Sequence, residues 1–260
     1  MSKKSKTVFI TGASSGIGME FARVFASMGY RLILTARREE RLNQIIEEVD
    51  VPCEKMLADL SKEEECHKLM EKLRDETIDV FINNAGFGIC GTFAETELEK
   101  EIDMIHVNVV AMHILFKGIL QKMKQAGKGR ILNVASSAGL LPAGPFMATY
   151  YATKSYVASL TKAVAEELKE EGSPVYVGAL CPGPVDTEFN EHAGVEFALK
   201  GISAKECVRE AMWGIKKRKV IIVPSTMMKF ARIGQNFLPE PALLKVVAHQ
   251  QKKKSGQESV

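Results

Sequence analysis

The sequence lacks the cysteine spacing of a disulfide framework or of a zinc site. It has no C-x-x-C motif, and its five cysteines are odd in number and far apart: Cys53, Cys66, Cys90, Cys181 and Cys207. Its five histidines likewise have no metal-ligand spacing. We therefore expect no metal site, and widely spaced thiols are typical of a reducing, cytoplasmic compartment.

A strong charge of one sign and long apolar runs are also missing. Lys plus Arg number 35 against 32 for Asp plus Glu, and a net charge of +3 is too small to indicate a nucleic-acid partner. The first six residues are polar and basic, so no export signal is expected there. The most apolar stretch, residues 107–116, is interrupted by Asn108 and His113 and is shorter than the roughly 18 residues that a membrane span needs. No spanning segment is predicted.

What the sequence does contain is an alternation of short apolar or β-branched runs with helix-forming stretches. The runs predict seven strands: Thr7–Thr11, Arg31–Thr35, Cys53–Leu57, Asp79–Asn83, Arg130–Val134, Val175–Leu180 and Val220–Val223. The helical stretches are Gly18–Ser27, Glu39–Val49, Ser61–Arg74, Ile102–Lys124 and Tyr150–Glu170. Such repeated strand–helix units predict an α/β fold: a single doubly wound Rossmann-type domain with a seven-stranded parallel sheet, over residues 1–260.

Two segments fall outside this alternation. Residues 184–205 follow a Pro-Gly-Pro turn and mix polar residues with glycines, which predicts a flap near the ligand. Residues 225–250 carry apolar residues at helical spacing, which predicts a helical tail. Packing on the domain or on a partner subunit, contact with a membrane surface, and a lid over the substrate are the alternatives for the role of this tail.

A glycine-rich turn follows the first predicted strand and opens the first helix. It reads T-G-A-S-S-G-I-G over residues 11–18, and its candidate cofactor-binding residues are Gly12, Ser14, Ser15, Gly16, Ile17 and Gly18. Glycines let the backbone approach a pyrophosphate, and the free N–H groups at the start of a helix favour its negative charge. The motif alone is shared with other nucleotide sites and with methyl-donor sites.

The end of the second predicted strand bears on which dinucleotide is bound. An acidic residue there would bind the adenosine ribose of NAD, whereas this sequence has Arg37 and Arg38. Two guanidinium groups suit the 2′-phosphate of NADP(H), although both arginines also fit a solvated helix start. Asp59 and Leu60, just past the third predicted strand, are further candidate cofactor-binding residues. Asp59 is expected to accept a hydrogen bond from the adenine amino group, and it is alternatively a helix cap.

A tyrosine and a lysine four positions apart are the main catalytic candidates. Tyr150 and Lys154 share one face of a predicted helix. Ser137, thirteen residues before Tyr150, follows a predicted strand at the edge where open α/β sheets bind ligands. The neighbouring Ser136 is predicted to have a structural role at the end of the strand. Tyr151 is predicted to pack, because no lysine follows it four positions later.

Taken together, these motifs closely resemble the short-chain dehydrogenase/reductase family. The matching elements span residues 7–223, and beyond the glycine turn they are Asn83-Asn84-Ala85-Gly86, Asn108, Ser137, Tyr150-x-x-x-Lys154, and Pro182-Gly183 with Thr187. The resemblance implies a catalytic tetrad of Asn108, Ser137, Tyr150 and Lys154. It also implies a homodimer or homotetramer, and a cofactor held by Tyr150 and Lys154 together with Asn84, Ala85, Gly86, Pro182, Gly183, Val185 and Thr187.

The expected reaction is the reversible reduction of a ketone or aldehyde to an alcohol with NADP(H). Tyr150 would exchange the proton, its pKa lowered from about 10 by the Lys154 ammonium and the oxidised nicotinamide. Lys154 would also hold the nicotinamide ribose, Ser137 the substrate oxygen, and Asn108 a water that links Lys154 to solvent.

The small-molecule substrate is expected to be apolar: a steroid, an acyl chain or an aliphatic carbonyl compound. Segments Ala138–Met147 and Phe189–Leu199 are the expected pocket walls, because both are rich in large apolar residues. The alternative function is a non-catalytic protein that binds NADP(H) to sense redox state or to hold an assembly together.

Overall fold

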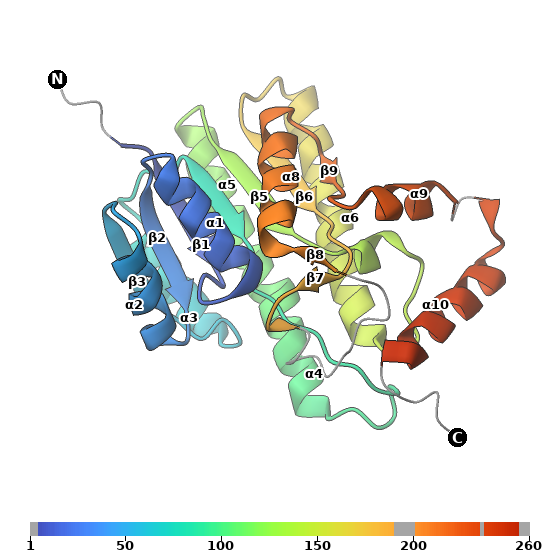
Figure 1. Ribbon diagram of the computed structural model, residues 1–260. Coiled ribbons are helices and arrows are strands. Elements are labelled where there is room, and N and C mark those ends of the chain that lie inside the picture. The colour runs from blue at the N-terminus through green and yellow to red at the C-terminus, as the bar shows by residue number, and fades with distance from the viewer. Residues whose placement is uncertain (1–4, 190–200, 235–236, 255–260) are drawn as a thin grey trace.

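A computed structural model describes residues 5–189, 201–234 and 237–254, and it contains a parallel sheet of seven strands (Figure 1). The strand order is β3-β2-β1-β4-β5-β6-β9. The strands are β1 (Thr7–Thr11), β2 (Arg31–Ala36), β3 (Cys53–Leu57), β4 (Val80–Asn83), β5 (Arg130–Val134), β6 (Tyr176–Leu180) and β9 (Ile221–Ile222). This is the Rossmann-like α/β fold that the sequence predicts.

Helices cover both faces of the sheet, which is why its strands are apolar on both sides. They are α1 (Gly16–Ser27), α2 (Glu39–Glu48), α3 (Glu63–Lys72), α5 (Met112–Gln125), α6 (Ala148–Glu170) and α8 (Ala204–Lys216). A further helix, α4 (Leu98–Ile105), packs against α6. Ile10 of β1 belongs to one core cluster with Phe21 of α1 and Val208 of α8. Its neighbour Phe9 belongs to a second cluster, with Leu115 of α5 and Val157 of α6.

The predicted strand bounds are close to those observed. Thr7–Thr11, Cys53–Leu57 and Arg130–Val134 agree at both ends, and the other four strands differ by one residue at one or both ends. The predicted helix over residues 102–124 is longer and is interrupted: α4 leads into a π-helix, η1 (His106–Ala111), which continues as α5.

The run Leu98–Gln125 is long and apolar enough to cross a membrane by length and composition. The sequence-based expectation of no spanning segment considered residues 107–116 alone and missed the length of this run. Within the fold, Leu115, Phe116 and Ile119 of the run pack in the core beneath the sheet. A core helix of a globular protein meets the same criteria, so the run is a weak indication of a span.

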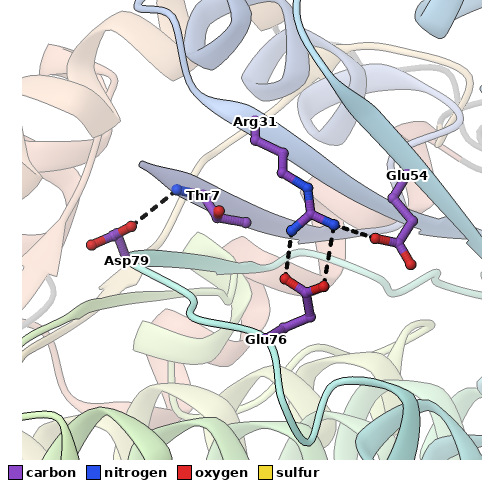
Figure 2. Close-up of polar contacts among 5 residues, drawn as sticks. All are labelled: Thr7, Arg31, Glu54, Glu76 and Asp79. Carbon is purple, nitrogen blue, oxygen red and sulfur yellow. Dashed lines mark hydrogen bonds and ion pairs between the residues drawn. The ribbon is translucent and has the colours of Figure 1, made fainter. Parts of the chain in front are cut away.

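An ion-pair cluster ties several segments together at the amino-terminal edge of the sheet (Figure 2). Arg31, the first residue of β2, donates to Glu76 at 2.5 Å and also to Glu54 of β3. The backbone N–H of Thr7 donates to the Asp79 carboxylate at 3.0 Å. Pairs this exposed contribute at most about 1 kcal/mol each. These contacts stabilise the first residues of the strands, at the edge of the sheet opposite the carboxyl ends.

The two irregular segments are partly described. The predicted flap begins with β7 (Val185–Asp186), which pairs in parallel with β8 (Ile202–Ser203), and residues 190–200 lie outside the described part of the chain. The tail is helical as predicted, forming α9 (Thr226–Gly234) and α10 (Glu240–Lys254). Val247 of α10 is buried in a cluster with Met147 and Tyr151, so this part of the tail packs on the rest of the chain.

Candidate active site

The strand order reverses between β1 and β4, because β2 and β3 extend the sheet in one direction and β5, β6 and β9 in the other. Ligands of open α/β sheets bind at the carboxyl ends of the strands, at such a reversal. A cavity of about 550 Å³ lies there, within the usual size range of ligand pockets. Its lining includes Gly12 after β1, Gly86 after β4 and Tyr150 of α6.

The cavity brings together almost all of the predicted site residues. The lining contains Gly12, Ser14, Ser15, Gly16, Ile17, Arg37, Arg38, Asp59, Leu60, Asn84, Ala85, Gly86, Ser137, Tyr150, Lys154, Pro182, Gly183, Val185 and Thr187. Two predicted residues, Gly18 and Asn108, are not part of the lining. Both instead contact residues that line the cavity: Gly18 packs against Gly12, and Asn108 hydrogen-bonds to Phe87.

The glycine turn requires glycine for two separate reasons. Gly12 and Gly16 have φ angles of +64° and +53°, in the left-handed region that side chains disfavour. A Cβ on Gly18 would stand 2.2 Å from the carbonyl oxygen of Gly12. The Asn84 side chain fixes the turn by donating to that oxygen at 3.1 Å and to the Thr11 carbonyl at 3.0 Å. The start of α1 borders the cavity, so the turn fits a pyrophosphate.

The two arginines after β2 line the cavity near the glycine turn. Arg37 is exposed, whereas Arg38 donates to the Glu188 carboxylate at 3.0 Å and to the Ser14 hydroxyl at 3.4 Å. Arg41 holds the second oxygen of Glu188 at 3.2 Å. The Glu188 carboxylate, near the start of the flap, thus lies against Arg38, one of the two cations that the sequence assigns to a 2′-phosphate, and against Arg41.

Asp59 closes a local turn. Its carboxylate accepts hydrogen bonds from the Ser61 backbone N–H at 3.2 Å and from the Ser61 hydroxyl at 3.0 Å. Helix α3 begins only at Glu63, with Lys62 as its N-cap residue, so Asp59 is not the cap of that helix. Among the residues that the structure describes, no group of three His, Cys, Asp or Glu side chains is arranged to hold a metal ion.

Tyr150 and Lys154 lie on one face of α6, as predicted. Lys154 Nζ is 5.9 Å from the centre of the Tyr150 ring and donates to the Val134 carbonyl, at the end of β5, at 3.0 Å. A Cβ on Gly86 would stand 3.0 Å from Lys154 Nζ and 2.8 Å from Asn108 Oδ1. The absence of a side chain at Gly86 therefore lets the loop after β4 pass over the lysine.

Asn108 holds that loop in place from within η1. Its side chain donates to the Phe87 carbonyl at 2.9 Å and to the Thr153 hydroxyl at 3.1 Å, and it accepts from the Phe87 N–H at 3.1 Å. Single π-helical turns inside α-helices are frequent at functional sites. The contacts make Asn108 a positioning residue, and its predicted water remains a prediction.

Burial governs the protonation of the tyrosine and the lysine. It raises the pKa of Tyr150 to about 12, partly offset by a hydrogen bond with the Ser136 side chain. Burial lowers the pKa of Lys154 to about 8, and the electrostatic interaction with Cys181 acts in the opposite direction. Among the protein's own groups, loss of water dominates the pKa of Tyr150. The lowering of this pKa by Lys154 together with the oxidised nicotinamide remains a prediction.

The serine hydroxyl beside Tyr150 belongs to Ser136. Ser136 precedes the 3-10 helix η2 (Ser137–Leu140), and its oxygen accepts the Ala138 N–H at 3.1 Å. Ser137 also lines the cavity, and its backbone N–H donates to the Pro182 carbonyl at 2.7 Å. Spacing along the chain favoured Ser137, whereas the conformation of the strand end brings the Ser136 hydroxyl to the phenol.

The remaining part of the cavity is largely apolar, apart from one buried polar pair and two exposed charged side chains. Met147 and Phe87 line it, and the Phe189 ring lies 5.6 Å from that of Tyr150. Gln251 of α10 donates to the Tyr151 hydroxyl at 2.5 Å, and both residues line the cavity. Of the second predicted wall, Phe189–Leu199, only Phe189 lies within the described residues. Gln251 could not be predicted from the sequence, because no motif surrounds it.

The fold and the cavity together define an α/β enzyme with a phosphate-binding turn and a tyrosine–lysine pair. The sequence pattern of the family described as short chain dehydrogenase matches residues 6–196. The chain belongs to this family and is an oxidoreductase of the short-chain dehydrogenase/reductase type.

Known relatives agree with this assignment. An uncharacterized oxidoreductase of Bacillus subtilis is 37% identical over 188 residues, which are 71% of this chain and 70% of that protein. A D-beta-hydroxybutyrate dehydrogenase of Rhizobium meliloti is 33% identical over 216 residues, or 80% and 83% of the two chains. The solved structure of a short-chain dehydrogenase from Sphingobium yanoikuyae in complex with NADPH has a TM-score of 0.79 at 32% identity, covering 89% of this chain and 95% of that one.

Proposed function

We propose that this protein interconverts a ketone or aldehyde with an alcohol, using NADP(H) and acting on an apolar substrate. The observation that carries the proposal is the meeting of the Tyr150 phenol, the Lys154 ammonium and a serine hydroxyl at one cavity, which continues to the glycine turn. The nicotinamide dinucleotide supplies the hydride for reduction and accepts it in oxidation.

Tyr150 is the proton donor in reduction. A pKa of about 12 keeps its phenol protonated at neutral pH, so it has a proton to give to the carbonyl oxygen. Lys154 is an ammonium below its pKa of about 8, and its charge favours the phenolate that remains. We also assign Lys154 to the ribose hydroxyls of the cofactor. In oxidation the proton passes from the alcohol to Tyr150.

We assign the substrate oxygen to Ser136 together with Tyr150. The Ser136 side chain interacts with the Tyr150 phenol, so a substrate oxygen placed against both hydroxyls can receive two hydrogen bonds. Such bonds stabilise the negative charge that develops on the oxygen during hydride transfer. Ser137, which the family resemblance implies, lines the same cavity and is the rival assignment.

The preference for NADP(H) rests on charge at the end of β2. Ala36 ends the strand and is followed by Arg37 and Arg38, so no carboxylate stands there to accept the ribose hydroxyls of NAD. Both guanidinium groups line the cavity. The NADPH held by the Sphingobium relative supports the same preference.

The test is to follow the absorbance of the reduced nicotinamide while purified protein is offered ketones and alcohols of increasing apolar size. NADP(H) and NAD(H) are run in parallel, with Tyr150→Phe as the control for chemistry. Turnover that favours NADP(H) by about tenfold or more is expected, which corresponds to roughly 1.4 kcal/mol of discrimination. Tight NADPH binding without turnover on the whole panel would instead favour the redox sensor or scaffold.

We further propose that residues 1–260 act as one domain in the cytoplasm and assemble as a homodimer or homotetramer. Tyr156 of α6 and His113 of α5 hydrogen-bond at 2.7 Å on an exposed face, and the exposed side chain of Ile102 on α4 is apolar. Side chains of this kind along α4, α5 and α6 suit a helical interface between identical subunits.

A further inference from the structure

Gln251 of α10 is a buried polar side chain with an unmatched hydrogen-bonding atom. The residue is 2% exposed, and its Nε2 donates to the Tyr151 hydroxyl at 2.5 Å. Its Oε1 has no hydrogen-bond partner among the described residues. A buried polar group without a partner is costly, and native proteins rarely retain one without a reason.

The pair formed by Gln251 and Tyr151 borders the same cavity as the reacting phenol. Both side chains belong to its lining. The rings of Tyr150 and Tyr151 stand edge to face with their centres 6.4 Å apart, so the pair lies about one ring away from the site of proton transfer. Around the pair the packing is apolar: Met147, which lines the cavity, and Val247 behind it belong to the same buried cluster as Tyr151.

The Tyr151 ring is held in position. A Cβ on Gly144 would stand 2.2 Å from this ring, so the backbone at Gly144 packs directly against it. On the opposite helix, Val247 is one turn before Gln251 and is 3% exposed, which anchors α10 at this point. The polar pair is therefore a fixed feature of the wall.

The pair can donate or accept a hydrogen bond. In the observed orientation Gln251 Nε2 donates to the Tyr151 oxygen, and Gln251 Oε1 is an unmatched acceptor. If the amide is rotated by 180°, Oε1 accepts from the Tyr151 hydroxyl instead, and the NH₂ group becomes an unmatched donor. Neither side chain is a charged group. The charged residues of the lining on this side, Lys100 and Asp103, are exposed, and Lys100 is paired with Glu97 at 2.7 Å.

We propose that Gln251 and Tyr151 form a specificity subsite that hydrogen-bonds a second, neutral polar group of the substrate, a hydroxyl or a further ketone. The proposal rests on the proposed function and narrows its substrate class to apolar carbonyl compounds with a second oxygen. A hydrocarbon ketone without that oxygen leaves the pair unmatched, whereas a substrate that carries it satisfies the pair. Sites built this way discriminate strongly against the analogue that lacks the group.

The test compares matched ketones with NADPH as the reductant: decalone with decalindione, and cyclohexanone with hydroxycyclohexanone. For the wild-type enzyme we expect kcat/KM to favour the two-oxygen member by about tenfold or more. Gln251→Leu is expected to bring that ratio to about one, chiefly through a higher KM for the two-oxygen ketone, since the lost contact is a binding contact.

Two further variants keep the test decisive. Tyr151→Phe retains the buried ring and removes only the hydroxyl, so it is expected to lower the ratio even where Gln251→Leu folds poorly. Gln250→Leu changes the exposed neighbouring glutamine of the same helix and is expected to keep the wild-type ratio. An unchanged ratio in Tyr151→Phe and Gln251→Leu, or a wild-type ratio near one, overturns the subsite alone. Absence of turnover by the wild type on all four ketones overturns the proposed function and the subsite with it.

Discussion

At the scale of single residues, burial sets the chemistry of the cavity. Tyr150 and Lys154 are 8% and 4% exposed, and loss of water disfavours the charged form of each. The phenol therefore holds its proton, and the lysine holds its own less tightly than it would in water. These opposite shifts suit a site that gives a proton to a carbonyl oxygen and then stabilises the anion left behind.

Lys154 predicts an alkaline limit for ketone reduction. Below its pKa of about 8 the ammonium is present; above it the charge is lost, while Tyr150 stays protonated up to about 12. We expect kcat/KM for reduction to fall as the pH rises through about 8, measured over a pH series with NADPH. A decline that begins only near pH 12 would contradict this.

The lowered pKa of Lys154 also makes the free energy of unfolding depend on pH. The folded-state pKa of Lys154 lies below its ordinary value of 10.5, so between about 8 and 10.5 the unfolded chain binds a proton that the native protein does not. The contribution of Lys154 to the free energy of unfolding therefore increases with pH across this window.

The two adjacent serines give a paired prediction. We expect Ser136→Ala to lower kcat by about a hundredfold or more, since it removes a donor to the developing negative charge. Ser137→Ala is the matched control, expected to stay within about threefold of the wild type because typical surface and lining changes are small. Steady-state reduction of one ketone by both variants measures the difference. The reverse order would restore Ser137 as the serine that contacts the substrate.

Glu188 predicts a change in cofactor affinity. Its carboxylate binds Arg38 at 3.0 Å and Arg41 at 3.2 Å, so a 2′-phosphate must compete with it for the same cations. We expect Glu188→Gln to tighten NADPH binding by about tenfold and to leave NADH binding unchanged, because only NADPH carries the competing phosphate. Fluorescence titration of both cofactors measures this. Glu171→Gln, which removes a surface pair with Lys124, is the control. Equal effects on the two cofactors would exclude competition for the arginines.

At the scale of elements, the site is assembled from the ends of strands and the starts of helices. Helix α6 supplies Tyr150, Tyr151 and Lys154 from adjacent turns, and β5 supplies the carbonyl that holds the lysine. Helix α10 closes the apolar part of the cavity with Gln251. The position of each side chain thus depends on packing between elements that are distant in the chain.

The junction of β1 and α1 yields a prediction about packing. A Cβ on Gly18 meets backbone, the Gly12 carbonyl oxygen at 2.2 Å, which cannot move without opening the turn. We expect Gly18→Ala to weaken dinucleotide binding by at least about tenfold and to lower the unfolding temperature, since overpacking typically costs 1–3 kcal/mol. Calorimetry and cofactor titration measure both. Gly234→Ala, where a Cβ meets nothing within 4 Å, is the control and should change neither.

At the scale of the whole molecule, the order of the strands decides where a ligand binds. The reversal between β1 and β4 opens the sheet at the carboxyl ends of these strands, and the cavity lies there. Residues from the glycine turn to α10 reach it, which accounts for a site spread over most of the chain.

The proposed assembly of identical subunits predicts the mass of the protein in solution. If α4, α5 and α6 form the interface between subunits, light scattering of the purified protein will give the mass of two or four chains of 28.7 kDa. Charge introduced at the interface, for instance Ile102→Glu, is expected to shift the mass toward one chain, because a buried unpaired charge is strongly unfavourable. A wild-type protein of one chain at micromolar concentration would refute the assembly.

Much of the fold and of the candidate site was predictable from the sequence. The strand bounds followed from short β-branched runs, and Tyr150 and Lys154 from a spacing of four on one helix. The interruption of the long helix by η1 was not predictable, because its residues have ordinary helical spacing. The interaction of Ser136 with Tyr150 was not predictable either, because a spacing counted along the chain carries no information about the direction of a side chain at the end of a strand.

The α/β alternation, the glycine turn and the tyrosine–lysine pair follow from the sequence alone, since each depends on residues that lie close together along the chain. The contact of Glu188 with Arg38, 150 positions away, and that of Gln251 with Tyr151, 100 positions away, exist only in the folded protein. Contacts of that range are set by how whole elements pack, and packing is a property of the folded chain that local periodicity does not contain.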